Sequence, residues 1–506
     1  MNAAPFLRRR TLPLAVLALY LLLAGWMARA EFVWTNEAWF ASPALNLIHR
    51  GYLGTTIFES KGTWLEGLDR HTYWIPPLYP LLQSLWYRLF GFSLTVMRWL
   101  SIAAGAVLLL AWYEVWKRLG ISRAVALTAL AIAATDVRFL TFAELGRPDV
   151  LCAALGTLGW ATYLRWRERS LLLAILAGNA LAATACMAHA CGTLYAAGLL
   201  LLTIYFDRRR LRWPALPCIA APYLGVLAAW GLYILQAPSQ FRTQFFGNIN
   251  GIGREFTGVS RLQGLASPLA GLKAELTFRY GAVFGRFAAD RADRVALLAL
   301  GIYVMAVAAC VLLPSIRRQS GYRALLLLGA LDYLLLGVFD GFKSSGYVIH
   351  TLPVVCACLA ICLHSLFARS GRKLVAAGLA AAILLFAALQ GNALYRGLCV
   401  TPERWDYAHA VAFVRSTGAA PHMIAGGEFA FEFGFDSGMV DDLRLGYFTG
   451  RRAPLIVANT IYQGWFEHSA TLAPAIHAYM SRLLRDEYRM VFHNSSYTIY
   501  QGVPER

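Results

Sequence analysis

Several ionisable side chains stand at the ends of long apolar segments, where a charge is costly and usually reflects a function. Glu37 follows the first such segment, and Arg147 and Asp149 share a short connection further along the chain. A carboxylate at such a place can remove a proton from an attacking group, and a cation can stabilise an anionic leaving group. Further candidates lie in or beside later connections on the same side: His189, Asp340, Lys343, Tyr347 and His350.

Apolar segments make up most of the chain and must position these residues. The protein has 506 residues, of which 58% are hydrophobic and 15% charged, whereas about a quarter of a soluble domain is charged. This composition excludes a single water-soluble globule, a disordered chain and a fibrous repeat. Since a spanning helix needs about 20 apolar residues, we expect about eleven spans, near 11–29, 99–116, 124–140, 150–164, 171–187, 191–206, 214–236, 296–314, 324–340, 347–367 and 374–392.

Basic clusters occupy every second connection between these segments. Six clusters hold nineteen lysines and arginines, against three acidic residues, and account for most of the net charge of +18. Because positive charge gathers at cytoplasmic loops, we predict a cytoplasmic N-terminus and a C-terminus outside the membrane. Nucleic-acid binding then becomes a poor explanation of the charge. The clusters lie at 8–10, 117–123, 165–169, 208–212, 317–323 and 369–373.

Two long exterior connections and a C-terminal region complete the predicted organisation. The membrane domain at 1–392 carries the connections 31–97 and 237–295, and residues 76–91 suggest a short amphipathic helix at the membrane interface. Residues 393–506 are more soluble in composition. We therefore predict a polytopic α-helical membrane protein with a small C-terminal α/β exterior domain. Its expected elements are helices at 403–417 and 471–485, a short strand at 422–426, another apolar run at 454–458, and a hairpin of 488–492 with 497–501.

The order of the candidate residues resembles the GT-C superfamily of glycosyltransferases that use polyprenyl-phosphate sugars. It is most similar to the branch containing protein O-mannosyltransferases and the lipid A aminoarabinose transferase. The resemblance covers about 1–400 in layout, and its motifs are weak singly but stronger in their joint order. It rests on Asn36-Glu37-Ala38, the stretch 76–91 with Arg98 beyond it, Arg147-Pro148-Asp149, and the late set Lys343, Tyr347 and Pro353.

The resemblance implies a GT-C fold and transfer of a sugar from a polyprenyl phosphate, such as an undecaprenyl phosphate, at the outer face of the cell inner membrane. The acceptor would be lipid A, another glycan, a glycolipid or a protein. A one-step displacement with a carboxylate base would invert the anomeric carbon. The catalytic candidates are Glu37 and Asp149, and those for the donor phosphate are Arg147, Lys343, Tyr347, Arg98 and Arg254, with Asn36, His189 and His350 as further candidates.

One position departs from the family, and simpler interpretations stay open. The family usually has aspartate where this chain has Asn36, and an asparagine does not accept a proton, so the base would be Glu37 or Asp149. Glu37 also suits a plain carboxylate at a helix N-terminus, and Arg147 with Asp149 suits an ion pair that closes a turn. The alternative functions are a transporter or flippase of lipid-linked sugars and a catalytically inactive GT-C relative.

No motif points to a metal or nucleotide site. H-E-x-x-H, G-x-S-x-G and P-loop patterns are absent, and the glycines at 247–253 follow no expected strand. The sequence predicts no certain cofactor and leaves a requirement for a divalent metal ion open.

Overall fold

The chain folds into two compact units, each built from three separate segments of sequence. A computed structural model describes residues 4–250, 263–285, 292–369, 373–395, 399, 402–418, 422–436 and 438–503. Residues 400–506, which were predicted as most of a separate C-terminal domain, share their unit with parts of both predicted exterior connections. The first unit comprises Met1–Arg29, Arg98–Gly231 and Leu262–Cys399, and the second Ala30–Met97, Leu232–Arg261 and Val400–Arg506.

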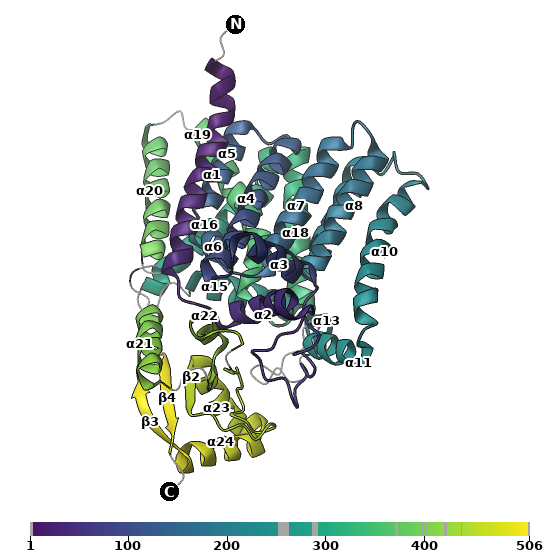
Figure 1. Cartoon of the computed structure of the whole chain (residues 1–506). Coiled ribbons are helices and arrows are strands. Elements are labelled where there is room, and N and C mark those ends of the chain that lie inside the picture. Colours follow the sequence, from purple (N-terminus) through teal and green to yellow (C-terminus); the bar gives the residue numbers. More distant parts are fainter. Residues whose placement is uncertain are drawn as a thin grey trace. The chain divides into compact units, whose positions relative to one another are not determined.

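The first unit is a bundle of long helices (Figure 1). Glycines allow close packing of α7 (Pro148–Trp166) on α8 (Leu171–Ala188), since a Cβ on Gly159 would lie 2.8 Å from the carbonyl oxygen of Gly178. Its elements, some of which run a few residues into the other unit, are α1 (Ala4–Ala30), α4 (Leu94–Arg118), α5 (Arg123–Thr135), α6 (Val137–Glu144), α7 (Pro148–Trp166), α8 (Leu171–Ala188), α9 (Gly192–Asp207), α10 (Ala215–Ile234), α13 (Gln263–Ala266), α14 (Pro268–Ala274), η2 (Glu275–Tyr280), α15 (Gly281–Gly285), α16 (Ala292–Leu312), α17 (Pro314–Arg317), α18 (Ser320–Phe339), η3 (Ser345–Tyr347), α19 (Val348–Arg369) and α20 (Lys373–Tyr395).

The expected spans all fall on helices of this bundle. Among the described residues, six helices are long and apolar enough to cross a membrane: Thr11–Ala30, Leu94–Arg118, Leu171–Ala188, Ala215–Ile234, Ser320–Phe339 and Ser345–Phe367. These helices support a multi-pass membrane protein, while the count of eleven crossings and the orientation of the termini stay predictions.

The expected span at 124–140 is a bent pair of helices rather than one straight helix. α5 and α6 meet at an angle of 61° and form a seventh candidate span if the two are taken together. The break lies at Asp136, whose backbone is extended with φ −68° and ψ 124°. Its side chain accepts a hydrogen bond from the backbone N–H of Arg138 at 2.8 Å and so begins a new helix.

The second unit combines short helices with one four-stranded sheet. The helix expected within 76–91 is present as α3 (Leu78–Phe90), and its place at the membrane interface stays a prediction. It ends at Gly91 in a positive-φ conformation (φ 78°) that favours glycine. Its elements are α2 (Thr35–Arg50), α3 (Leu78–Phe90), α11 (Pro238–Phe241), η1 (Arg242–Phe246), α12 (Gly247–Asn250), α21 (Pro402–Thr417), β1 (Met423–Ala425), η5 (Gly427–Phe429), α22 (Ala430–Phe433), β2 (Leu455–Asn459), α23 (Thr460–Leu472), α24 (Pro474–Asp486), β3 (Tyr488–His493) and β4 (Tyr497–Gly502).

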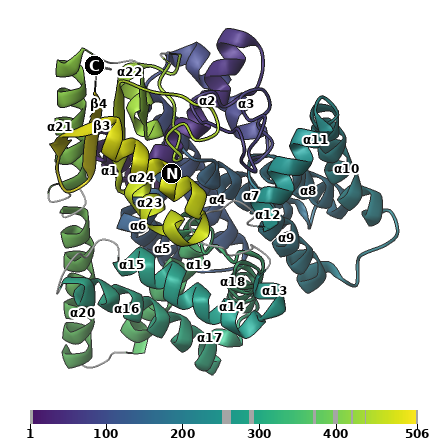
Figure 2. The same ribbon diagram turned by 90° about the horizontal axis from the view of Figure 1, so that it is seen from below.

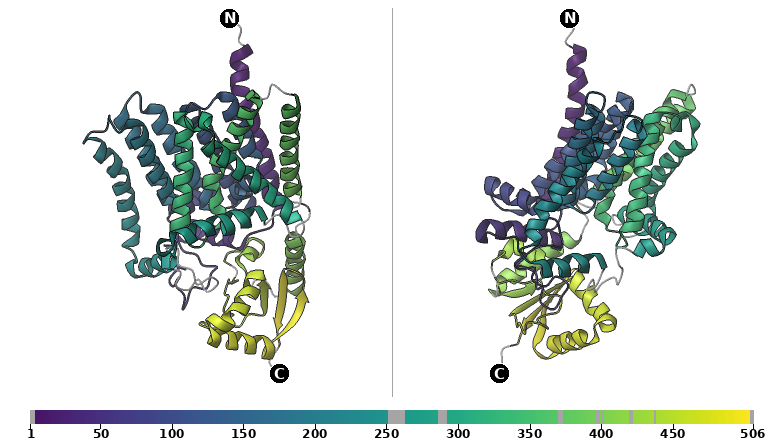
Figure 3. Two further views of the ribbon diagram at one scale, coloured as in Figure 1. Left: turned by 180° about the vertical axis from the view of Figure 1, so that it is seen from behind. Right: turned by 90° about the vertical axis from the view of Figure 1, so that its right-hand side faces the viewer.

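The strands lie in the order β1-β2-β4-β3, with β1 parallel to β2 and the other neighbours antiparallel. The predicted hairpin is β3 with β4, the yellow arrows of Figure 3. Alternate residues of each strand face opposite sides of the sheet. Helices α23 and α24 lie side by side (Figure 2) and pack against Ile424 and Ile456 on one face.

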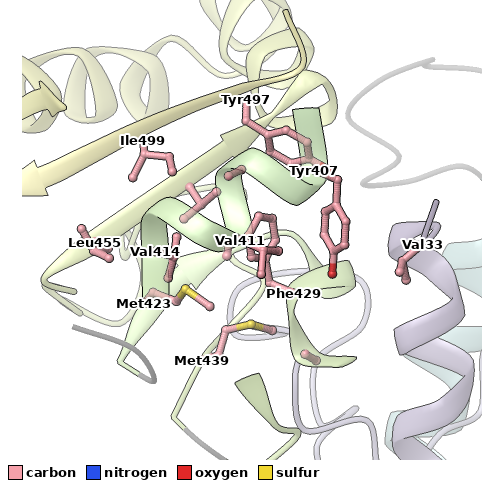
Figure 4. Packing of buried hydrophobic residues seen from close by; sticks show 14 of the residues in the cluster. Val33, Tyr407, Val411, Val414, Met423, Phe429, Met439, Leu455, Tyr497 and Ile499 are labelled. Carbon is pink, nitrogen blue, oxygen red and sulfur yellow. The ribbon is translucent and has the colours of Figure 1, made fainter. Parts of the chain in front are cut away.

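The other face of the sheet is covered by α21. Tyr407, Val411 and Val414 of this helix pack on Leu455 and Ile499 (Figure 4). The same core contains Val33, just before α2, so the C-terminal segment and the connection 31–97, which was predicted to be exterior, share one set of buried side chains.

Candidate active site

Arg147 and Asp149 flank the start of α7 and form an ion pair. Pro148 occupies the first helical position, where its missing N–H costs nothing. The Nε of Arg147 donates to Oδ2 of Asp149 at 2.8 Å, and Asp149 is only 2% exposed. Both the guanidinium and the positive end of the helix dipole favour the ionised carboxylate. Asp149 Oδ1 is buried without a hydrogen-bond partner within the described residues.

Two histidines adjoin this pair, and each contacts a tyrosine. His189 and His350 both interact electrostatically with Asp149. The backbone N–H of Cys191 donates to Nδ1 of His189, so the neutral ring carries its proton on Nε2, which lies 3.3 Å from the hydroxyl of Tyr347. His350 is buried at the start of α19, and its Nδ1 lies 2.8 Å from the hydroxyl oxygen of Tyr195.

A buried cluster of charges continues from Tyr347. The Arg279 guanidinium carbon lies 5.3 Å from the centre of the Tyr347 ring. Arg279 is fully buried, and its nitrogens contact the carboxylates of Asp340 at 2.5 Å and Glu275 at 3.3 Å. The other oxygen of Glu275 lies 3.3 Å from the ammonium of Lys343.

Lys343 also closes the end of α18 and has a strained backbone. Its ammonium donates to the carbonyl of Gly337 at 2.7 Å and to that of Leu336 at 3.2 Å, where the negative end of a helix dipole favours a cation. Its φ of 52° lies in the left-handed region, which costs a residue other than glycine about 1–2 kcal/mol. Strain of this kind concentrates at functional sites.

The structure brings most of the candidates together and adds residues that the sequence analysis missed. Contacts or electrostatic interactions connect Arg147, Asp149, His189, Tyr347 and His350 into one cluster. Arg279 and Glu275, which connect this cluster with Lys343, were not identified. The available signal was their i, i+4 spacing beside an aromatic residue, in a segment that was assigned to an exterior connection.

Glu37 belongs to the second unit, where it lies in the first turn of α2. It is fully buried, and its Oε2 accepts a hydrogen bond from the backbone N–H of Trp34 at 3.0 Å. This is the arrangement expected of a carboxylate at a helix N-terminus, and it is compatible with a chemical role for the same group. Asn36 Oδ1 and the hydroxyl of Tyr87 are buried without hydrogen-bond partners in the described part of the chain.

Of the two other candidates for the donor phosphate, Arg98 and Arg254, the structure describes only Arg98. Arg98 is fully buried in the first unit, where it donates to the carbonyl of Ala28 at 3.0 Å and lies 3.6 Å from Glu144. These contacts suit an internal ion pair, and a role at the donor phosphate stays a prediction. Arg254 lies outside the described residues.

Two buried carboxylates of the C-terminal segment contact α2 on either side of Glu37. Glu428 Oε2 accepts a hydrogen bond from the hydroxyl of Thr35 at 2.6 Å, and Asp441 Oδ2 accepts one from the indole N–H of Trp39 at 2.8 Å. Both carboxylates are 1% exposed. Burial raises the pKa of Glu428, and burial together with the Glu428 charge, against the Trp39 hydrogen bond, raises the pKa of Asp441 to about 7.

This raised pKa predicts a pH-dependent stability. The folded protein holds a proton on Asp441 up to about pH 7, whereas the unfolded chain releases it near the ordinary value of 3.8. The contribution is therefore fully present below pH 3.8 and is lost as the pH rises through 7. In detergent, the melting temperature of Asp441→Asn relative to wild type should rise between about pH 5 and pH 7.5. A difference independent of pH would contradict the assignment.

The described residues offer no evident metal centre. Within them, no group of three or more histidine, cysteine, aspartate or glutamate side chains is arranged to hold a metal ion.

Comparison with solved structures identifies proteins that share the fold. The crystal structure of ArnT from Cupriavidus metallidurans bound to undecaprenyl phosphate covers 99% of this chain and 99% of its own, with a TM-score of 0.55 and 14% identity. The archaeal oligosaccharyltransferase AglB from Archaeoglobus fulgidus, in complex with an inhibitory peptide and a dolichol-phosphate, covers 97% of this chain and 74% of its own, with a TM-score of 0.53 and 12% identity. No protein-family profile and no curated protein matches the sequence.

Proposed function

We propose, from the premise that this chain has the GT-C fold, that it is a membrane glycosyltransferase using a polyprenyl-phosphate sugar. The observation that carries the proposal is the buried cluster from Asp149 to Lys343, in which carboxylates hold three cations in place. A site that holds cations in this way suits an anionic leaving group. The fold it shares with an undecaprenyl phosphate-bound ArnT supports the same conclusion.

The proposed reaction is a single displacement at the anomeric carbon. A hydroxyl or amine of the acceptor attacks C1 of the sugar, and the bond between C1 and the phosphate oxygen breaks. The electron pair leaves with the polyprenyl phosphate, whose new negative charge Arg147 and Lys343 would stabilise. The acceptor proton passes to a carboxylate, and the configuration at C1 inverts.

Glu37 is the better candidate for the base, and Asp149 for orienting Arg147. An arginine ion pair opposes protonation of a carboxylate, so Asp149 is a weak proton acceptor. The same 2.8 Å contact fixes the guanidinium, which suits recognition of a phosphate. Asn36, which stands where the GT-C family usually has aspartate, does not accept a proton, so we assign the role of the base to the neighbouring carboxylate of Glu37. The acceptor, at the outer face of the inner membrane, would be lipid A, another glycan, a glycolipid or a protein.

Reconstitution in vesicles tests the proposal against the alternatives. Purified protein with polyprenyl-phosphate sugars and an envelope extract should release free polyprenyl phosphate only when the extract supplies an acceptor. A flippase would move the lipid-linked sugar between leaflets without release. An inactive relative would bind the donor and release nothing. Either of these results, with folded protein, would overturn the transferase assignment.

A further inference from the structure

Near its N-terminus, α2 makes buried hydrogen bonds that have no part in the reaction proposed above. Thr35 and Trp39 lie four residues apart, so they share one face of the helix, and Glu37 lies between them in sequence. Glu428 accepts a hydrogen bond from Thr35, and Asp441 accepts one from Trp39. All of these residues belong to the second unit, and η5 packs directly against α2.

We propose that Glu428 and Asp441 are positioning residues that hold the first turn of α2 and thereby orient Glu37 for proton transfer. The proposal rests on the proposed role of Glu37 as the base. It assigns the C-terminal segment a part in the reaction, although α2 and Glu37 lie in a different part of the sequence.

The hydrogen bonds around the two carboxylates are too specific for a simple packing contact. Glu428 also accepts from the side chains of Asn459 at 2.8 Å and Tyr497 at 3.4 Å. Asp441 also accepts from the hydroxyl of Tyr462 at 2.9 Å and the backbone N–H of Gly427 at 3.1 Å. A fully bonded buried network fixes the directions of its members.

Two buried carboxylates close to each other cost free energy of folding, so their presence points to a role beyond packing. Each raises the free energy of ionising the other, and no lysine or arginine in the described ranges pairs with either. Apolar side chains of similar size would hold two surfaces together at lower cost. Hydrogen bonds add what apolar contacts lack, a defined orientation of α2 about its axis.

The backbones approach closely to allow these bonds. A Cβ on Gly427 would lie 2.9 Å from the carbonyl oxygen of Thr35 and 3.1 Å from the indole nitrogen of Trp39. Asp441 is also bonded through its backbone to the first exterior connection, donating to Ile57 at 2.7 Å and accepting from Glu59 at 3.0 Å. Movement of α2 is thus restricted by side chains and backbone together.

Replacing Thr35 tests the proposal with a nearly isosteric pair of variants. Thr35→Val removes the hydroxyl bonded to Glu428, and Thr35→Ser keeps it. We expect Thr35→Val to lower kcat for release of polyprenyl phosphate about tenfold or more, because small misplacements of a reacting group are costly. KM for the donor should stay within about twofold, because a shift of α2 changes the position of Glu37 relative to the acceptor proton and not the binding of the donor. Thr35→Ser should restore the wild-type rate.

Two further variants separate positioning from general stability. Thr498→Val removes hydrogen bonds to His493 and Gln463 elsewhere in the same segment and should leave kcat unchanged. If Thr35→Val does not fold, Trp39→Phe removes the indole donor to Asp441, together with part of the ring that packs on Phe58 and Trp74, and should give the same fall in kcat in protein that remains folded.

The outcomes distinguish this inference from the proposed function. Wild-type kcat in Thr35→Val, with Glu37→Gln inactive, overturns the positioning role and leaves the transferase intact. Equal losses in Thr35→Val and Thr498→Val also overturn it, because they would report stability alone. A wild-type rate in Glu37→Gln removes Glu37 as the base, and with it the inference, while release of polyprenyl phosphate still supports the transferase.

Discussion

Glu37→Gln is expected to lower the rate of polyprenyl phosphate release at least about a hundredfold, because a general base contributes about 10²–10⁴-fold. The glutamine keeps the side-chain oxygen that accepts from Trp34, so α2 should remain folded. The loss should fall on kcat, with little change in KM for the donor, since the base acts on the acceptor proton. Steady-state release assays in detergent at saturating donor measure this directly.

Asp149→Asn is the matched comparison for that variant. It removes the charge that holds Arg147, which lies 2.8 Å away, and should raise KM for the donor as well as lower kcat. If instead only kcat falls in Asp149→Asn and Glu37→Gln keeps the wild-type rate, Asp149 is the base. If both variants keep the wild-type rate, neither carboxylate takes the proton.

Arg279→Gln is expected to destabilise the protein by about 3–5 kcal/mol, the usual cost of leaving buried charges without their partner. Arg279 is fully buried between Glu275 and Asp340, and glutamine cannot neutralise both carboxylates. The rate of release should also fall, because Lys343 and Tyr347 both depend on this cluster. Thermal unfolding in detergent, followed by tryptophan fluorescence, measures the change in stability.

A surface ion pair provides the control for Arg279. Arg452 contacts Glu487 at 2.6 Å, but both side chains are more than two-fifths exposed. Arg452→Gln should therefore cost about 1 kcal/mol or less. Equal shifts of the melting temperature in the two arginine variants would mean that the buried cluster contributes no more than an exposed pair.

Local patterns in the sequence were sufficient for most helices and for the hairpin. A continuous apolar run predicts a helix such as α8 or α19 because residues within the run satisfy its backbone hydrogen bonds. The β3–β4 hairpin follows equally from its own residues, Asn494 among them, whose Oδ1 accepts from the N–H of Tyr497 at 2.8 Å. The break at Asp136 escaped prediction although Asp136 and Arg138 interrupt the apolar run, because the segment 124–140 as a whole is apolar enough to be assigned as one span.

Some residues of the candidate site could likewise be identified from the sequence, whereas others were found only in the tertiary structure. Arg147, Asp149 and Tyr347 stood out in the sequence because a charged or polar group beside an apolar span is rare. Arg279 did not, although Glu275 lies four residues before it, because its segment was assigned to an exterior connection. Its other partner, Asp340, is 61 residues away, and that pairing exists only in the folded chain.

The sequence by itself determined an apolar helical chain with ionisable groups at its span ends, because hydropathy and charge are local properties. The tertiary structure alone decided which groups meet. Thr35 and Glu428 are separated by 393 residues and Trp39 and Asp441 by 402, yet each pair forms one hydrogen bond. Such contacts leave no periodicity or spacing in the sequence, because they depend on how distant segments pack around a common core.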